Sequence, residues 1–247
     1  MSVLLRRVLG WLGALMCGIG VPAWAEMPAT VAGVAHVSST AVRGLRFDVS
    51  GRRCDDQWEQ LWYAADGTLV AHEIVQISAG RWQQYRLVRP PAAQSFVAER
   101  DGAIIRLTSR HGSRQSTQLI RAGSDVLAGP TLIPYLVTHG ERLRRGEMAT
   151  VQFLVPDQGL VLGLRVQRTA LGADGYWVVK LDAESSWLRP FVPVTHFTFD
   201  AQDRLMSMQG RLLPLWVRRS GSEPLEGVLS LSPSVGMKSA CNIKKLS

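Results

Sequence analysis

Residues 160–182 read LVLGLRVQRTALGADGYWVVKLD, and this stretch is the clearest indicator of the fold class. Apolar side chains occupy every second position over 160–167 and again over 176–182. A strand with one buried face produces this period of two. Between the two runs lies Asp174-Gly175, a pair that can take the positive φ values of a tight hairpin turn. The stretch therefore predicts a β-hairpin.

The same alternation recurs along the chain. Further strands are predicted over residues 69–77, 81–88, 103–109, 151–155 and 194–199. Asp66-Gly67 and Asp101-Gly102 each separate two such runs, as a hairpin turn would. Short strands joined by tight turns pair with their neighbours in antiparallel fashion. The predicted fold class is all-β: an antiparallel curved sheet, or an open barrel of hairpins.

One stretch, residues 130–146, breaks the alternation. Its apolar residues are spaced as in one or two helical turns, Pro130 is compatible with a first turn, and Gly140 can close the C-terminus. The sequence predicts a short helical plug here. A basic loop with Arg142, Arg144 and Arg145 follows it.

The N-terminus has the pattern of a secretory signal peptide. Arg6 and Arg7 precede an apolar run over 8–21, and Ala-Trp-Ala at 23–25 is a cleavage site. We therefore expect a signal peptide at 1–25, a mature chain from Glu26, and export to the periplasm. Three alternatives are lipid attachment at Cys17, twin-arginine export and an uncleaved leader that acts as an anchor. Ordinary export with cleavage fits the residues best.

Composition limits the class of the mature chain. Residues 26–247 suit a single β-rich domain, and the Ser-rich end suggests a loosely ordered C-terminal tail. Loss of Arg6 and Arg7 lowers the formal net charge from +8 to +6. A basic exported protein can make peripheral contact with an anionic membrane surface. Nucleic acid is excluded as a partner, because the basic residues are dispersed and the compartment is wrong.

Two cysteines remain after leader removal, Cys54 and Cys241. Cysteines in an oxidising compartment usually pair, so we expect a disulfide between them. The alternative is two unpaired thiols.

Catalytic signatures are absent from the sequence. It contains no Gly-x-Ser-x-Gly elbow, no Ser-x-x-Lys and no Gly-rich phosphate loop. Its 5 histidines are far apart, without the spacing of a common metal motif. We predict a protein that is not an enzyme and needs neither metal nor cofactor. An unrecognised hydrolase, with a site assembled only by the fold, is the alternative.

The tryptophans and the basic loop are the candidate binding residues. The mature chain keeps six tryptophans, which on sheets are mostly core residues. The alternative is that some of them, with Trp177 and Trp187 as candidates, line an apolar groove between a curved sheet and a helix. Arg142, Arg144 and Arg145 could then hold an anionic headgroup, or they could form a solvated charged turn.

A family resemblance accompanies these patterns. The leader, the Asp-Gly hairpins, the helical segment before Gly146-Glu147 and the Phe197-x-Phe199-Asp200 segment look like exported domains with the LolA/LolB/RseB-type open-barrel fold. Residues 47–55, FDVSGRRCD, with a second cysteine near the C-terminus, resemble the EipB family of cell-envelope integrity proteins. The resemblance implies a curved sheet around a helical plug. It also implies that Cys54 and Cys241 form a structural bridge.

The expected function follows from both lines of reasoning. We expect a non-enzymatic envelope protein that binds a lipid, a lipoprotein or another amphipathic ligand in an apolar groove. The alternative is an interaction or sensing module of the RseB kind, which contacts an envelope protein through open edges of its sheet.

Overall fold

The computed structural model describes residues 30–38, 44–218 and 221–233 of the 247 residues. Strands dominate these residues, with two short α-helices and three 3₁₀ turns. The strands are β1 (Thr30–Val37), β2 (Arg46–Cys54), β3 (Gln57–Ala64), β4 (Leu69–Ser78), β5 (Arg81–Arg89), β6 (Gln94–Asp101), β7 (Ile104–His111), β8 (Arg114–Arg121), β9 (Leu127–Ala128), β10 (Ala149–Val155), β11 (Leu160–Leu171), β12 (Trp177–Ala183), β13 (Thr195–Phe199), β14 (Leu205–Arg218) and β15 (Gly221–Pro233). The helical elements are η3 (Pro90–Ala92), η4 (Gly129–Thr131), α1 (Leu132–Thr138), α2 (Gly140–Arg144) and η5 (Pro156–Gln158).

All described strands belong to one sheet. Their order is β8-β7-β6-β5-β4-β3-β2-β1-β15-β14-β13-β12-β11-β10-β9, and every pair is antiparallel except the parallel pair β9/β10. The first and last strands meet at the centre, where Val31 of β1 pairs with Pro233 of β15. The two ends of the sheet, β8 and β9, are not paired with each other in this order. This confirms the predicted all-β fold class of an open, antiparallel sheet with a helical segment.

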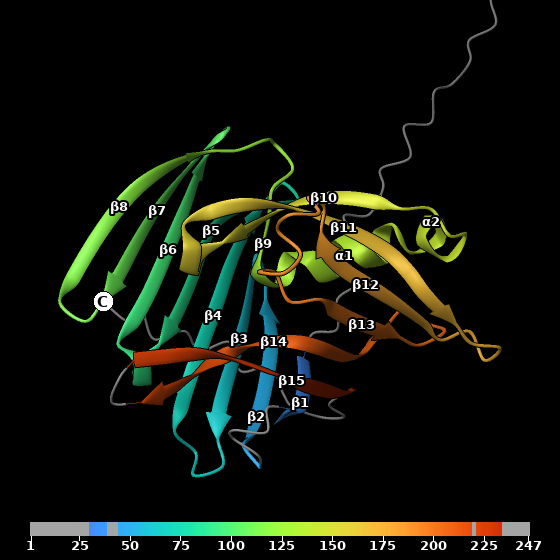
Figure 1. Ribbon diagram of the computed structural model, residues 1–247, viewed down its shortest axis with the longest axis horizontal. Coiled ribbons are helices and arrows are strands. Elements are labelled where there is room, and N and C mark those ends of the chain that lie inside the picture. Colours follow the sequence, from blue (N-terminus) through green and yellow to red (C-terminus); the bar gives the residue numbers. More distant parts are fainter. Residues whose placement is uncertain (1–29, 39–43, 219–220, 234–247) are drawn as a thin grey trace, which may run out of the picture.

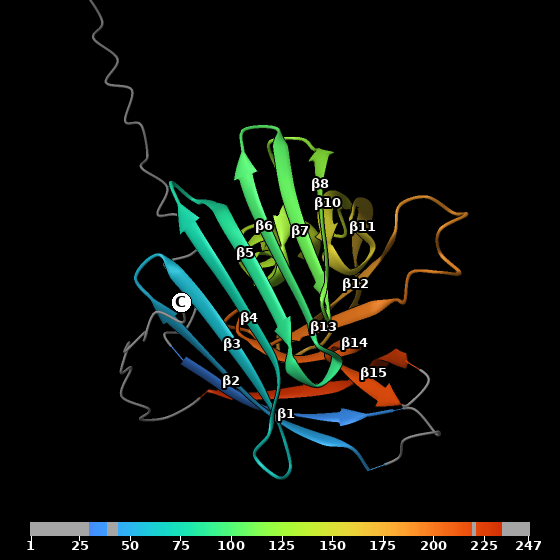
Figure 2. The same cartoon turned by 90° about the vertical axis from the view of Figure 1, so that its left-hand side faces the viewer.

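The sheet curls so that its two ends approach each other. The strands β2–β8 form one wall and β10–β14 form the other, with β1 and β15 at the base (Figures 1 and 2). Side chains bridge the gap: the indole nitrogen of Trp82 donates to the Val126 carbonyl over 2.7 Å, and the Gln118 amide donates to the Gly159 carbonyl over 2.8 Å. The concave face is therefore closed on several sides.

The three Asp-Gly pairs do form turns between paired strands. Gly67, Gly102 and Gly175 have φ values of +82°, +55° and +85°, which glycine adopts at little cost. The prediction that both residues of each pair take positive φ is wrong, because the preceding aspartates stay outside the left-handed region. The glycine alone supplies the reversal, and a register shift at Trp62/Tyr63 accompanies the first turn.

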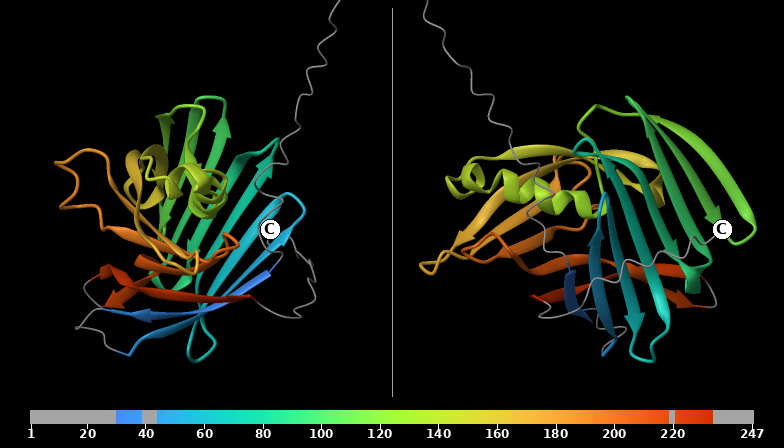
Figure 3. Two further views of the ribbon diagram at one scale, coloured as in Figure 1. Left: turned by 90° about the vertical axis from the view of Figure 1, so that its right-hand side faces the viewer. Right: turned by 180° about the vertical axis from the view of Figure 1, so that it is seen from behind.

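The predicted helical plug is two helices rather than one. Both lie on the concave side of the sheet (Figure 3). The prediction that Gly140 ends the helix is wrong, since Gly140 begins α2 and is buried. Its lack of a side chain serves packing: an added Cβ would lie 3.3 Å from Cζ2 of Trp177. The chain reverses instead at Gly146, where φ is +88°.

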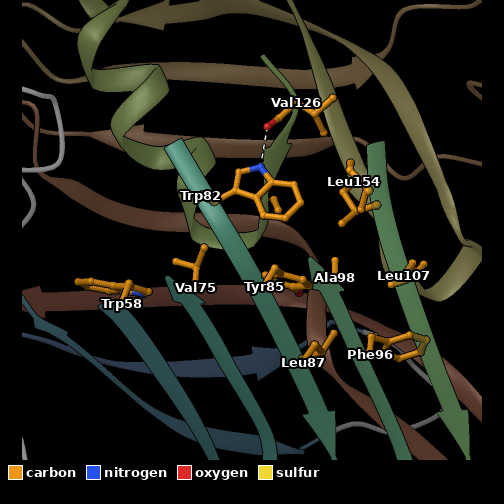
Figure 4. Packing of buried hydrophobic residues seen from close by; sticks show 12 residues of the cluster. Trp58, Val75, Trp82, Tyr85, Leu87, Phe96, Ala98, Leu107, Val126 and Leu154 are labelled. Carbon is orange, nitrogen blue, oxygen red and sulfur yellow. Dashed lines mark hydrogen bonds between the residues drawn. The ribbon is translucent and has the colours of Figure 1, made fainter. Parts of the chain in front are cut away.

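Three apolar clusters fill the curl. The first joins the β3–β7 wall to Val126, Ala128 and Leu154, with Trp82 between them (Figure 4). The second packs α1 and α2 against β10–β13, and the third joins β1–β4 to β14 and β15. The core is thus spread around the concave face, which leaves room in the middle of the curl.

The described residues test only some of the predictions made for the two ends of the chain. The strand β15 runs to Pro233, further into the Ser-rich segment than the sequence indicates, because Leu229 and Leu231 continue the apolar alternation. The signal peptide, residues 234–247 and Cys241 lie outside the described residues. None of the helices within the described ranges is long and apolar enough to cross a membrane.

Cys54, the other predicted bridge residue, is buried at the end of β2. The disulfide stays a prediction that a mass measurement can check. We expect the exported protein to show no alkylated thiol before reduction and two after it. A third alkylated thiol would mean that the leader and Cys17 are retained, and two thiols reactive without reductant would contradict the bridge.

Candidate ligand-binding cavity

The curl encloses a cavity of about 480 Å³. This volume lies in the range of sites that hold small molecules in proteins. The cavity extends from the β3–β5 wall, past α1, to the β10–β14 wall. Phe191 lines it and is 73% exposed, so the cavity reaches the surface beside the loop between β12 and β13.

Apolar side chains make up most of the lining. They come from elements far apart in the sequence, because the curl turns the inward faces of strands from both walls toward the same space. Typical members are Leu87 of β5, Val137 of α1, Leu162 of β11, Phe197 of β13 and Leu213 of β14. Such a lining favours an apolar ligand, since water inside it finds few hydrogen-bond partners.

A partly buried ionic network interrupts this lining. Asp157 of η5 accepts hydrogen bonds from Arg89 Nη1 over 2.8 Å and from Arg211 Nη2 over 2.7 Å. Arg89, whose side chain is only 4% exposed, also donates from Nε to the Leu213 carbonyl over 2.7 Å and contacts Gln94 over 3.4 Å. The network joins β5, η5 and β14. It places two guanidinium groups and one carboxylate on the cavity wall.

A carboxyl group lies near this network. Glu73 of β4 is buried and accepts a hydrogen bond from the Tyr85 hydroxyl over 2.8 Å. Burial raises the pKa of Glu73 to about 7, although the Tyr85 hydrogen bond and the charge of Arg89 act in the opposite direction. Burial also raises the pKa of Tyr85. The backbone of Gly129 presses against the pair, because an added Cβ there would lie 2.5 Å from Glu73 Oε1.

Two further polar groups lie on β3, in tryptophans that belong to the cavity lining. The indole nitrogens of Trp58 and Trp62 are buried and have no hydrogen-bond partner among the described residues. A buried donor without a partner destabilises a protein by roughly 1–3 kcal/mol. Between them, the Gln60 side chain faces the same cavity and pairs in register with Glu73.

The arginines of the basic loop lie outside the cavity lining. Arg142 donates to Glu147 over 2.8 Å, and Arg145 binds Glu141 over 2.9 Å and Glu147 over 3.0 Å. These hydrogen bonds lower the pKa of Glu147. The structure therefore pairs the exposed arginines with neighbouring carboxylates. The prediction of a loop here is wrong, because Arg142 and Arg144 belong to α2 and Arg145 directly follows it.

Trp177, a candidate groove residue, is fully buried in the core instead of lining the cavity. It stacks on Phe199 with ring centroids 4.5 Å apart, and its indole nitrogen donates to Asp203 over 3.0 Å. The guanidinium of Arg144 lies 5.3 Å from the indole ring and forms an ion pair with the same Asp203. Arg144 and Trp177 thus serve one structural cluster.

Trp187 lies in the loop between β12 and β13 and is 70% exposed. It is outside the cavity lining, but Phe191, Val192 and Pro193 of the same loop belong to it. The exposed apolar side chains of this loop are Trp187, Phe191 and Val194, of which Phe191 lines the cavity.

The histidines do not assemble into a metal site. Within the described parts of the chain, no group of three or more His, Cys, Asp or Glu side chains is placed to hold a metal ion. His72 contacts Glu59 over 2.8 Å, and His139 contacts the Tyr135 carbonyl over 2.9 Å.

The polar residues of the cavity were missed by the sequence analysis. Glu73 and Arg89 do carry a signal, because each is a charged residue at an inward position of an otherwise apolar alternation in its strand. Asp157 and Arg211 carry no local signal. They meet only because the curl brings η5 against β14, 54 residues apart in the chain.

Comparison with known proteins adds little to this geometry. The sequence matches no protein-family model and none of the curated proteins compared with it. Among solved structures, the chain is similar to a β-barrel-like protein of domain of unknown function DUF1849 from Brucella abortus. The two share 6% sequence identity at a TM-score of 0.46, over 82% of this chain and 96% of that one. The description as an open β-sheet accordingly rests on the strand pairing above.

Proposed function

We propose that this chain is a non-enzymatic protein of the cell envelope that binds the acyl chain of a lipid, a lipoprotein or another amphipathic ligand in its cavity. The single observation that carries the proposal is the cavity of about 480 Å³ with its predominantly apolar lining. Apolar surface that is withdrawn from water by a ligand contributes roughly 25 cal/mol per Å² to binding. An acyl chain has the chemistry to make such contacts along the whole cavity.

Two further features support the proposal. The loop that reaches the opening through Phe191 also exposes the apolar side chains of Trp187 and Val194, as suits a protein that receives an amphipathic molecule from a membrane or a carrier. The predicted signal peptide and the positive net charge favour an envelope location with anionic surfaces nearby.

The test is native mass spectrometry of protein purified from the periplasm of a bacterial host, followed by organic extraction of the bound material. We expect a bound amphiphile with an acyl chain. The variant Val137→Trp fills the cavity from α1 and should carry at least tenfold less of it.

Thr138→Trp is the matched control, because Thr138 is the next residue of α1 and is exposed. It should retain the ligand at the wild-type level. Thermal unfolding of both variants establishes that they fold. Wild-type protein that carries no amphiphile and binds none of a series of added fatty acids would contradict the proposal.

A second candidate function is protein recognition through the edge of the sheet. The strand β8 is almost entirely exposed, and within the described ranges only β7 pairs with it. An open edge of this kind can add a strand from another protein. Recovery of one crosslinked envelope protein, at a site within β8 and from protein that holds no lipid, would favour this function over the first.

A further inference from the structure

The unused hydrogen-bonding capacity of the cavity's arginines is all donor capacity. Arg89 Nη2 has no hydrogen-bond partner among the described residues, and Arg211 binds only through Nη2. A ligand that satisfies these groups must bring acceptor oxygens.

The charges on the same wall also favour an anionic ligand. Arg89 and Arg211 carry two positive charges against the single negative charge of Asp157. With Glu73 protonated, the polar part of the cavity therefore keeps one uncompensated positive charge. The other charged residues of the lining are compensated separately, as Asp203 pairs with Arg144 and Arg204 pairs with Asp200 over 2.6 Å. A ligand with one negative charge would neutralise the site.

We infer that the cavity selects an amphiphile with an oxyanion head group, a carboxylate or a phosphate, which binds Arg89 and Arg211 while the acyl chain follows the apolar wall. This inference rests on the proposed acyl-chain binding and names its ligand class. Guanidinium groups suit such a head group, because their planar donors match two oxygens at once. The head group thus lies inside the curl, away from Arg142 and Arg145.

Glu73 makes the affinity for an anion depend on pH. On the elements packed against β4, the titratable and charged groups that line the cavity with Glu73 are Tyr85 and Arg89 of β5 and Arg211 of β14, with Asp157 beyond Arg89. The other such groups of the adjacent strands, Glu59 and Tyr63 of β3 and Arg81 and Arg86 of β5, are outside the lining. Above pH 7, an ionised Glu73 cancels the remaining positive charge. The anion should consequently bind more weakly there, by about tenfold between pH 6 and pH 8.5.

The experiment measures the affinity of the purified, delipidated full-length mature protein for four probes of equal chain length: laurate, dodecyl phosphate, dodecanol and dodecylammonium, each below its micelle concentration. We expect laurate or dodecyl phosphate to bind at least tenfold more tightly than dodecanol at pH 6, and dodecylammonium to bind most weakly. The order of the two anions distinguishes a carboxylate site from a phosphate site. The laurate affinity, but not the dodecanol affinity, should fall as the pH rises.

The variants locate the head group. Arg211→Gln should weaken the binding of the preferred anion by about tenfold and leave dodecanol unchanged. Arg211→Lys, which keeps the charge, should restore most of the affinity. Arg218→Gln is the matched control, because Arg218 lies on the same strand, pairs with Glu223 and is not part of the cavity lining. Glu73→Gln should abolish the pH dependence of laurate binding.

Each outcome bears on a different claim. Equal affinity for anions and dodecanol would overturn the head-group inference and leave acyl-chain binding intact. A loss of anion affinity in the double variant Arg142→Gln/Arg145→Gln, with none in Arg211→Gln, would move the head group to the basic loop and overturn the inference. Binding of none of the four probes would overturn the inference together with the proposed function.

Discussion

Trp177→Ala should lower the free energy of unfolding by about 4 kcal/mol, because truncation of a fully buried tryptophan removes its apolar contacts and leaves a void. The Trp177 indole is inaccessible to solvent, stacks on Phe199 and touches the backbone at Gly140. Its loss also leaves Asp203 without one donor and Arg144 without the ring that it covers. Urea unfolding followed by circular dichroism measures the change.

Trp187→Ala is the control for this prediction. Trp177 begins β12, and Trp187 lies in the loop that follows this strand. Unlike Trp177, Trp187 is 70% exposed. A substitution at an exposed position without partners usually changes stability by less than about 0.5 kcal/mol. Similar losses in the two variants, or a larger loss in Trp187→Ala, would contradict the assignment of Trp177 to the core.

The contrast between these residues illustrates what the alternation could predict. The period of two assigned β11 and β12 to strands and placed Trp177 on an apolar face, because the concave side of the sheet is buried at that point. It could not say whether that face lines a cavity or packs against helices. The answer depends on where α2 lies. Gly140 of α2 packs against Trp177, which is far along the chain, and no local pattern predicts that contact.

Several strands were not predicted. β2, β6 and β14 are among them although each has a buried face, whereas β8 was missed for a physical reason. The strand β8, RQSTQLIR, is exposed on nearly every residue, so its side chains show no alternation. Only its backbone pairing with β7 makes it a strand. The pairing of β1 with β15 also has no local signal, because those strands come from opposite ends of the chain. Local periodicity therefore predicted the fold class but not the closure of the curl that creates the cavity.

The stability of the ligand-free protein should fall as the pH rises from about 4.5 to 7, and Glu73 is the cause. Burial raises the pKa of Glu73 from 4.5 to about 7 in the folded state. Over this interval the folded chain keeps a proton that the unfolded chain has released, so each rise in pH favours unfolding. The shift corresponds to a loss of about 3 kcal/mol, which is complete once the pH exceeds 7.

Glu73→Gln isolates this contribution. A glutamine oxygen can still accept the hydrogen bond from Tyr85, but the side chain does not ionise in the buried site. We therefore expect the variant to be more stable than the wild type at pH 8, by about 3 kcal/mol, and the difference to shrink toward zero at pH 4.5. Urea unfolding at both pH values measures it, with Glu99→Gln as the control at an exposed carboxylate.

An unchanged pH dependence in Glu73→Gln would show that the Glu73 pKa is not raised, whatever the cavity binds. A pH dependence that is lost in Glu73→Gln would have a consequence for ligand binding in the cavity. A bound oxyanion adds negative charge near Glu73 and raises its pKa further, so laurate should stabilise the wild type more at pH 6 than at pH 8. In Glu73→Gln the stabilisation by laurate should be equal at the two pH values. The carboxyl that weakens the empty fold at neutral pH would then be the group through which pH controls binding.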